Sequence, residues 1–375
     1  MAVRSVLHVA GSAEWAGGEV YLLQLAQALD RSRFRLSVVA PGDGPLVGRL
    51  QAMGVPVFVV PIAEHLLSLP ALMALTRLLK RERPHLVQSH GARSNFYSRL
   101  ACRLAGIPRC VSTVHNSLYD YPVSPGRRVL YLTLDRLTTP LADTIICVAE
   151  SLARDLIERS RVPARKVVVI QNGVDLTVFH PDRGDGSKIR EEFGLGESPV
   201  IGMVGRMTPQ KNHSDFLKAL ARVRGAIPQV RALIVGDGPL RQEIEREVAH
   251  LGLEAVCRFA GVRQDIADCY AAMDVVVLSS VSEGFPYVVL EALAMARPLV
   301  ATSVNGVPEI VDDRLNGLLV PPREPAALAD AILALLRDPD CARALGQAGR
   351  KLVESRFSLE RMIHRLQSLY SESTT

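Results

Sequence analysis

The sequence lacks the patterns typical of disulfide frameworks, zinc sites and membrane-spanning segments. Its six cysteines are scattered, with no C-x-x-C pair and no histidine at the spacing of a zinc site. No apolar run is long enough to span a membrane, and the run before Gly11 is too short for a signal peptide. We therefore expect a cytoplasmic protein with reduced thiols.

Low-complexity tracts, short-period repeats and nucleic-acid-binding motifs are also missing, and we expect no nucleic-acid partner. What remains is an ordinary composition, with 48% hydrophobic and 22% charged residues. This profile is typical of a globular enzyme. A chain of 375 residues is long enough for two domains that each bury a core.

Charge is distributed unevenly between the two halves of the chain. Residues 1–180 carry 21 Lys and Arg against 13 Asp and Glu, whereas residues 181–375 carry 23 against 26. The basic first half suggests contact with something anionic, such as a membrane surface or a phosphorylated lipid. An arginine-rich surface without a partner is an equally good explanation, and the charge alone does not separate the two.

Short apolar runs alternate with stretches whose apolar residues have helical spacing, such as Val20–Leu29 and Leu69–Lys80. This rhythm predicts parallel strands covered by helices on both faces. The runs in the first half are Val6–Val9, Leu36–Val39, Val57–Val60, Leu86–Gln88, Cys110–Val114, Thr144–Val148 and Val167–Ile170.

A polar, turn-rich segment ending at residues 181–186 interrupts this rhythm and predicts an interdomain linker. A second series of strands follows it. Its runs are Val200–Val204, Ala232–Val235, Val256–Ala260, Val275–Leu278, Leu299–Ala301 and Gly317–Val320. The sequence thus predicts two Rossmann-like, doubly wound α/β domains facing across a cleft: residues 1–180, residues 181–355, and a C-terminal helix over 356–375 that packs back towards the first domain.

The strongest motif is SEGFPYVVLE at residues 282–291, directly after the run Val275–Leu278. Pro286 suits the first position of a helix, so Glu283 should lie in the loop and Glu291 in the second helical turn. Such a loop at the carboxyl end of a parallel strand is where anionic ligands meet free N–H groups. We expect the two carboxylates to bind sugar and ribose hydroxyls.

A second motif, GRMTPQKN at residues 205–212, follows the run Val200–Val204 and supplies two cations. Arg206 and Lys211 are suited to neutralising a diphosphate leaving group without a metal ion. Either cation alone would be a weak signal, because surface Arg and Lys are usually just solvated. Combined with the carboxylate pair, the signal is strong.

Together, GR…QKN, the GDG at residues 236–238 and SEGFP…E resemble the retaining family 4 glycosyltransferases over nearly the whole chain. The resemblance implies the GT-B fold, with Arg206 and Lys211 on the donor diphosphate. It also implies that Glu283 contacts the transferred sugar, assisted by backbone amides around Gly284, Phe285 and Pro286, while Glu291 holds the donor ribose. Gly236 and Gly238 would lie beside the nucleotide.

The first half offers further site residues. Gly17 and Gly18, in WAGGE at residues 15–19, open a helix and would let the backbone approach a phosphate; they resemble the family's glycine-rich loop. His115 follows the run Cys110–Val114. A histidine at a strand end is more often structural, but the resemblance implies one here that contacts the transferred sugar.

Acceptor contacts are expected from QSHGARSN at residues 88–95, where His90 ends a strand and Arg93 and Asn95 follow. Structural roles for these three residues are equally well supported. Gly173 and Asp175 resemble the family's motif at the exit of the first domain, and their predicted role is geometric, with Asn172 and Gly173 forming a turn.

Three other patterns have weaker claims to function. The GDG lacks the third glycine of a dinucleotide fingerprint, which argues against a nicotinamide site. The D-x-D at residues 338–340 follows a helix, so a helix-ending turn is expected rather than a metal site. The helix Leu69–Lys80 carries Arg77 and Lys80 beside leucines, and both packing on the sheet and lying on anionic lipid remain open.

The sequence therefore predicts a retaining, metal-independent glycosyltransferase that uses a UDP- or GDP-sugar, without a cofactor. The acceptor would be lipid-linked, a saccharide or a small molecule, and the basic first half favours envelope or extracellular polysaccharide synthesis at the inner membrane face. Two alternatives stay open: a non-hydrolysing nucleotide-sugar epimerase and a non-catalytic nucleotide-sugar-binding protein.

Overall fold

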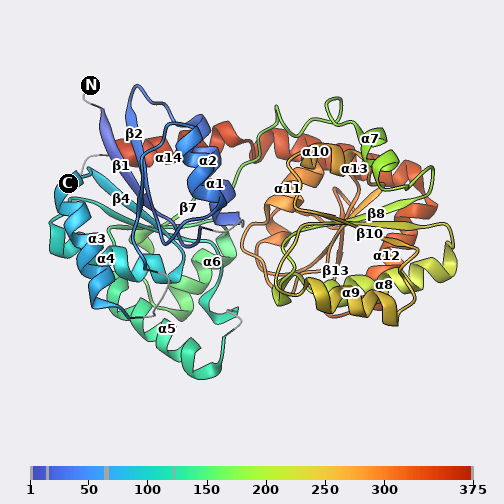
Figure 1. Ribbon diagram of the computed structural model, residues 1–375, viewed down its shortest axis with the longest axis horizontal. Coiled ribbons are helices and arrows are strands. Elements are labelled where there is room, and N and C mark those ends of the chain that lie inside the picture. The colour runs from blue at the N-terminus through green and yellow to red at the C-terminus, as the bar shows by residue number, and fades with distance from the viewer. Residues whose placement is uncertain (1–2, 14–16, 63–66, 121–122, 373–375) are drawn as a thin grey trace. The chain divides into compact units, whose positions relative to one another are not determined.

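The computed structural model describes residues 3–13, 17–62, 67–120 and 123–372. The chain divides into two compact units (Figure 1). Unit 1 consists of residues 1–172 together with 359–375, and unit 2 consists of residues 173–358. The division thus falls eight residues before the boundary expected from the sequence, and the C-terminal helix α14 (Leu359–Ser371) belongs to unit 1.

Unit 1 is built around a seven-stranded parallel sheet with the order β3-β2-β1-β4-β5-β6-β7. Its strands are β1 (Arg4–Val9), β2 (Phe34–Ala40), β3 (Val57–Val59), β4 (Leu86–His90), β5 (Cys110–Val114), β6 (Thr144–Cys147) and β7 (Val167–Val169). Besides α14, its helices are α1 (Gly17–Ala28), α2 (Pro45–Ala52), α3 (Leu69–Glu82), α4 (Ala92–Ala105), α5 (Pro125–Thr138) and α6 (Glu150–Arg154).

Unit 2 repeats the design with six parallel strands in the order β10-β9-β8-β11-β12-β13. These are β8 (Val200–Val204), β9 (Arg231–Val235), β10 (Cys257–Gly261), β11 (Val275–Leu278), β12 (Leu299–Thr302) and β13 (Leu318–Val320). Its helices are α7 (Gly186–Glu192), α8 (His213–Ala226), α9 (Arg241–His250), α10 (Ile266–Ala271), α11 (Tyr287–Ala294), α12 (Pro325–Arg337) and α13 (Pro339–Arg356).

Every apolar run predicted as a strand overlaps one in the structure, so the predicted fold class of two doubly wound parallel sheets is confirmed. The strands are nearly continuous apolar runs because helices cover both faces of each sheet. β8 and β11, for example, are buried at every residue. No helix within the described residues is long and apolar enough to cross a bilayer.

Local differences from the prediction are small. Pro286 is the residue that caps α11 rather than its first helical residue, so the helix begins at Tyr287. The D-x-D segment forms the turn between α12 and α13, where the Asp338 carboxylate accepts from the Cys341 N–H at 3.0 Å. No turn forms at Asn172 and Gly173, where one was expected; Asp175 instead makes a side-chain turn, accepting from the Thr177 N–H at 2.8 Å.

Each sheet has one point where the strand order reverses, between β1 and β4 in unit 1 and between β8 and β11 in unit 2. At such a point the loops that leave the carboxyl ends of the two strands diverge, which opens a crevice for a ligand. The motifs at residues 205–212 and 282–291 follow β8 and β11, and the loops to α1 and α4 follow β1 and β4.

Candidate active site

In unit 2, the loops that follow β8 and β11 are hydrogen-bonded to each other. The Val281 N–H donates to the Gln210 carbonyl at 2.9 Å, and the Gln210 side-chain amide donates to the Ser282 carbonyl at 2.6 Å. The Ser279 hydroxyl donates to the Lys211 carbonyl at 3.0 Å. These bonds hold the two sequence motifs side by side at the switch point.

The centre of this arrangement is an ion pair between Lys211 Nζ and Glu283 Oε1, 2.6 Å apart. Both side chains are mostly buried, with exposed fractions of 17% and 7%. Glu283 Oε1 also accepts from the Ser280 hydroxyl at 2.6 Å, and the Glu283 N–H donates to Asn305 Oδ1 at 3.2 Å. Two contacts therefore hold the carboxylate, and a third holds the backbone of the same residue.

Glu291 lies on α11 and accepts a hydrogen bond from the Tyr270 hydroxyl at 2.8 Å. Burial raises the pKa of Glu291 to about 7, although the Tyr270 hydrogen bond and the charge of Lys211 act in the opposite direction. Lys211 is thus paired with one carboxylate and within electrostatic reach of the other.

Arg206, in contrast, is exposed, and its side chain makes no hydrogen bond or ion pair with any residue that the structure describes. It follows β8 in the same loop as Lys211. An arginine at the carboxyl end of a strand with an unused guanidinium is available to bind an anion.

The glycines of the GDG motif are required by packing. A Cβ atom at Gly236 would lie 2.1 Å from the Gly205 carbonyl oxygen, and one at Gly238 would lie 2.6 Å from the Met207 carbonyl oxygen. The Met207 N–H donates to the Asp237 carbonyl at 2.9 Å. These glycines let the loop after β9 lie directly against the loop that carries Arg206.

Apart from the half-buried Val288, the residues between the two glutamates are buried. Phe285 packs edge-to-face on Phe357 with ring centroids 5.3 Å apart, which anchors the loop in unit 2. Pro286 caps α11 and has no N–H group, so any backbone donor to a ligand here must come from its neighbours, such as Gly284.

In unit 1, three histidines line up at the carboxyl ends of the central strands. His8 Nδ1 lies 2.8 Å from His90 Nε2, and His90 Nδ1 lies 3.0 Å from His115 Nε2. The His90 ring is 2% exposed and uses both nitrogens in these contacts, so it is not positioned to contact an acceptor directly. Burial lowers the pKa of His115 to about 4.

A pocket lies beside His115 in unit 1. It is bounded by the segments that follow β4 and β5 and by residues of α5 and α6, and its lining includes Asn95, Ser117, Asp135 and Asp155. Asp155 begins a π-helical turn over Asp155–Arg159, and it accepts from the Ser117 hydroxyl at 3.0 Å. π-Helical turns of this kind are frequent at functional sites.

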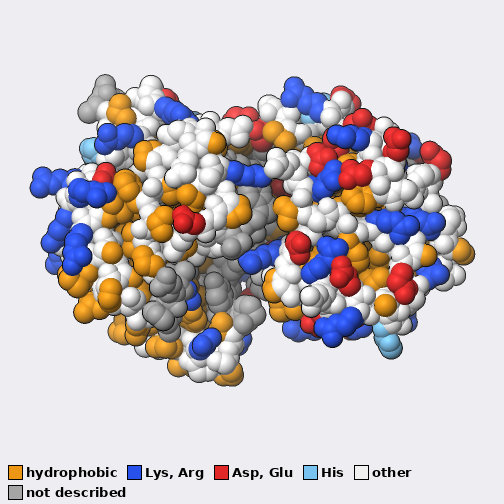
Figure 2. All heavy atoms as spheres, viewed as in Figure 1, with side chains coloured by type: hydrophobic (Ala, Val, Ile, Leu, Met, Phe, Trp, Pro, Cys, Tyr) orange, Lys and Arg blue, Asp and Glu red, His pale blue; other side chains and the backbone are white. Residues whose placement is uncertain are grey.

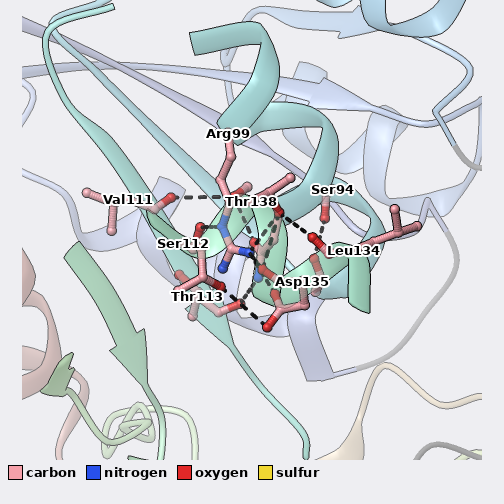
Figure 3. A network of polar contacts seen from close by, with 12 residues as sticks. Ser94, Arg99, Val111, Ser112, Thr113, Leu134, Asp135 and Thr138 are labelled. Carbon is pink, nitrogen blue, oxygen red and sulfur yellow. Dashed lines mark hydrogen bonds and ion pairs between the residues drawn. The ribbon is translucent and has the colours of Figure 1, made fainter. Parts of the chain in front are cut away.

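Asp135 reaches the pocket because a buried arginine holds it there (Figure 3). Arg99 is 1% exposed, and its guanidinium points toward Ser112, Asp135 and Thr138. It donates to Asp135 Oδ1 at 2.6 Å and to the Ser112 hydroxyl at 2.9 Å. The network ties α5 to the sheet through α4 and β5.

The other two residues expected at the acceptor differ in position. Asn95 lines the pocket, but its side chain is engaged: Oδ1 accepts from the Ser89 hydroxyl at 2.7 Å and Nδ2 donates to the Thr113 carbonyl at 3.2 Å. Arg93 is half-buried and lies 3.4 Å from the Tyr131 hydroxyl. Asn95 therefore shapes the pocket wall, and Arg93 does not line it.

Gly17 and Gly18 form the first turn of α1. A Cβ atom at Gly18 would meet no atom of the described residues within 4 Å. A helix N-terminus is a suitable place for an anion. Residues 15 and 16 of the same motif lie outside the described residues.

Several residues of the site were not predicted from the sequence. Ser280, Asn305 and Tyr270 hold the two glutamates, but serine, asparagine and tyrosine are too common in loops to single out. Position was the only signal: Ser280 and Asn305 follow a buried strand by two and three residues, and Tyr270 lies in a neighbouring helix. Within the described part of the chain, no three His, Cys, Asp or Glu side chains are grouped as metal ligands.

Comparison with protein families matches both units. Residues 15–178 match the model described as Glycosyltransferase Family 4, and residues 198–338 match the model described as Glycosyl transferases group 1. The two matches cover the strand-end segments described above in both units.

Curated relatives and solved structures agree over most of the length. The UDP-Gal:alpha-D-GlcNAc-diphosphoundecaprenol alpha-1,3-galactosyltransferase of Escherichia coli is 28% identical over 356 residues, which cover 93% of this chain and 92% of that protein. The GDP-mannose-dependent alpha-(1-6)-phosphatidylinositol monomannoside mannosyltransferase of Mycobacterium tuberculosis is 27% identical and covers 70% of each chain. The structure of Anabaena HepE with UDP-glucose superposes with a TM-score of 0.86 at 24% identity, covering 98% of this chain and 99% of that one.

Proposed function

Because the chain belongs to the family 4 glycosyltransferases, we propose that it moves a sugar from a UDP- or GDP-sugar to an acceptor hydroxyl with retention of the anomeric configuration. The observation that supports this most directly is the Lys211–Glu283 ion pair at the switch point of unit 2, with Arg206 in the same loop and without a side-chain partner among the described residues. Cations suited to binding a diphosphate and carboxylates suited to binding hydroxyls thus lie at the same edge of the unit 2 sheet.

Each donor group has a residue suited to it. Arg206 and Lys211 bind the diphosphate and stabilise the charge that develops on it as it leaves. Glu283 accepts hydrogen bonds from the transferred sugar, and Glu291 accepts them from the ribose. The first turn of α1 in unit 1, with Gly17 and Gly18, offers further backbone N–H donors to a phosphate or a sugar.

We propose that no enzyme nucleophile takes part. The acceptor oxygen bonds to the anomeric carbon on the face from which the diphosphate departs, the bond from that carbon to the diphosphate oxygen breaks, and the acceptor proton passes to the departing diphosphate. Glu283 is engaged by Lys211 and Ser280, which suits it to hold a hydroxyl rather than attack carbon. The two cations take the place of a metal ion.

The donor nucleotide has two candidates, UDP and GDP. The relatives named above include one that uses UDP-galactose and one that uses GDP-mannose, and the base would be selected outside the ionic centre. Gly236 and Gly238 shape the loop next to Arg206, so their contribution to nucleotide binding is indirect.

We further propose that the acceptor enters the pocket beside His115 in unit 1. Two carboxylates, Asp135 and Asp155, line it together with hydroxyl groups such as that of Ser117. This lining favours hydrogen bonds to sugar hydroxyls. The E. coli relative is named for a lipid-linked diphosphate acceptor, and an acceptor of that class for polysaccharide or glycolipid assembly fits our proposal.

An anionic membrane surface is a proposed partner of unit 1, through α5 rather than α3. In α3, Leu75, Leu78 and Leu79 are buried, and the exposed Leu69 and Met73 lie in its first two turns. On α5, Val129 and Leu137 are 64% and 69% exposed. Figure 2 shows Lys and Arg side chains gathered along the outer edge of unit 1 and hydrophobic side chains around α5.

Co-sedimentation with vesicles tests the membrane partner. The protein should pellet with vesicles that contain anionic lipid and stay in solution with neutral ones, and Leu137→Ser should weaken pelleting more than Leu315→Ser, which alters an equally exposed leucine of unit 2. Equal behaviour on both lipids would remove the membrane from the proposal.

The reaction is tested by incubating the protein with UDP- and GDP-sugars, with and without saccharide and lipid-linked acceptors, in EDTA and in magnesium. Acceptor-dependent release of nucleoside diphosphate, equal in EDTA, with an α-linked product from an α-linked donor supports the proposal. An isomerised nucleotide sugar formed without acceptor would identify an epimerase instead, and binding without turnover would identify a non-catalytic protein.

A further inference from the structure

The contacts of the three histidines continue beyond them to a tyrosine and a glutamine. His8 Nε2 lies 3.4 Å from the Tyr370 hydroxyl, and that hydroxyl lies 2.5 Å from Gln88 Oε1. The chain of contacts thus runs from Gln88 through Tyr370, His8 and His90 to His115. It crosses unit 1 from α14 through β1 and β4 to the end of β5.

All three imidazoles are uncharged. Burial lowers the pKa of His8 to about 3 and that of His115 to about 4, and burial together with the two neighbouring rings holds the pKa of His90 well below its usual value. A neutral imidazole has one N–H donor and one acceptor nitrogen. Each contact between two rings needs one N–H donor and one acceptor nitrogen. The N–H groups of the three rings must therefore all point in the same direction along this series of contacts.

Gln88 decides that direction. Its Nε2 lies 2.8 Å from the Thr113 hydroxyl and 3.3 Å from the Tyr21 hydroxyl, distances typical of N–H···O bonds. Its Oε1 lies 2.5 Å from the Tyr370 hydroxyl, which fits O–H···O and is too short for N–H···O. The amide oxygen therefore faces Tyr370.

A carbonyl oxygen can only accept, so Tyr370 gives its single proton to Gln88. Burial raises the pKa of Tyr370 well above its usual value, which keeps that proton in place. The Tyr370 oxygen must then accept from His8 Nε2, His8 Nδ1 accepts from His90 Nε2, and His90 Nδ1 accepts from His115 Nε2. Nδ1 of His115 therefore carries no proton.

This nitrogen has no hydrogen-bond partner among the described residues, and His115 lines the pocket of unit 1. We propose that Gln88, Tyr370, His8 and His90 are positioning residues that hold the proton of His115 on Nε2, so that Nδ1 meets substrate only as a hydrogen-bond acceptor. The proposal rests on the proposed function for the identity of its partner, a hydroxyl of the donor sugar or the acceptor.

The Tyr370 end of this series of hydrogen-bonded side chains is held in place by contacts of α14 with the rest of unit 1. α14 packs against α1 (Figure 1), and Arg4 and Arg109 donate to the carbonyls of Tyr370 and Leu369 at 2.7 Å and 2.6 Å. Gln367 accepts from the Asp30 N–H at 3.0 Å. Tyr370 therefore cannot easily leave Gln88 and His8, and the direction of the protons is fixed by the fold.

The direct test is the ¹⁵N spectrum of the full-length protein labelled at histidine, because a protonated and a bare ring nitrogen differ in chemical shift. The His115 signals are assigned by their loss in His115→Gln. We expect a protonated Nε2 and a bare Nδ1 in the wild type. A wild-type His115 that carries its proton on Nδ1 would overturn the proposal, whether or not the protein transfers sugar.

Tyr370→Phe tests whether this series of hydrogen-bonded side chains sets the tautomer of His115. Without the hydroxyl, both proton directions become accessible, so the His115 signals should move toward the average of the two tautomers. Phe34→Leu is the matched control, because Phe34 packs edge-to-face on Tyr370 at 5.8 Å but makes no hydrogen bond in the chain. Signals that stay at wild-type positions in Tyr370→Phe would contradict the proposal.

In the transfer assay, Tyr370→Phe should lower kcat about tenfold, the effect of one misplaced hydrogen bond, with the KM of the donor nearly unchanged. His8→Gln retains one acceptor and one donor and should keep more activity than His8→Phe. If Tyr370→Phe shifts the tautomer but leaves kcat at the wild-type value, Nδ1 plays no part in the reaction and the proposal fails.

Discussion

Lys211 Nζ lies 2.6 Å from Glu283 Oε1, although the two residues are 72 positions apart and follow different strands. The strand order places β8 next to β11, and the hydrogen bonds between their loops complete the approach. The pair is mostly buried, so each charge depends on the other. This relationship makes the ion pair part of the fold as well as of the proposed donor site.

Lys211→Met should therefore destabilise unit 2 by about 3 kcal/mol, because it leaves a buried carboxylate without its cation. The double variant Lys211→Met with Glu283→Gln removes both charges and should recover most of that loss. Urea unfolding of the two variants measures the difference.

Activity should not follow stability in this series. The double variant should remain inactive in sugar transfer, because it has neither the cation for the diphosphate nor the carboxylate for the sugar. A stable double variant with wild-type turnover would show that the pair is structural only.

Gly236→Ala should destabilise unit 2 by roughly 1–3 kcal/mol, because its methyl group would overlap the Gly205 carbonyl. Gly225→Ala is the control: a methyl group there meets nothing within 4 Å, and it should stabilise α8 by about 0.5–1 kcal/mol. Thermal unfolding of both variants checks the contrast. Equal effects would mean that the loops after β8 and β9 do not approach as closely as the structure has them.

Glu291→Gln should change how stability depends on pH. The pKa of Glu291 is about 7 in the folded protein and near 4.5 when unfolded, so between these values the folded state binds the extra proton. Raising the pH through this window lowers the stability of the wild type, and the glutamine variant lacks this term.

We expect the stability of Glu291→Gln relative to the wild type to rise between pH 5 and pH 8, by roughly 1–3 kcal/mol. Urea unfolding at several pH values measures it. Glu243→Gln, at an exposed position of α9, should show no such trend. A flat difference for Glu291→Gln would mean that its carboxyl is not desolvated.

The fold could be predicted from the sequence because parallel strands between covering helices are nearly continuous apolar runs. His90 shows the limit of that approach. Its place at the end of β4 was evident, but a single strand end does not reveal that His8 and His115 lie on either side of it. That juxtaposition depends on the order of β1, β4 and β5 in the sheet.

In the candidate site, the charged residues were recognisable because their motifs are rare, whereas their supports were not. Tyr270 is an ordinary helical residue until α10 brings its hydroxyl to Glu291. Gly236 was interpreted through its likeness to a nucleotide loop, but the atom nearest to its missing side chain is the Gly205 carbonyl, which only coordinates reveal.

The most direct test of the donor site is the calorimetric titration of the wild type with UDP, GDP and ADP, repeated on Arg206→Ala and on Arg222→Ala. Both arginines are exposed on unit 2, and removing either should change stability by less than about 0.5 kcal/mol. We predict that UDP or GDP binds the wild type and Arg222→Ala alike and that Arg206→Ala binds at least about tenfold more weakly. Equal binding by all three proteins would contradict the donor site described here.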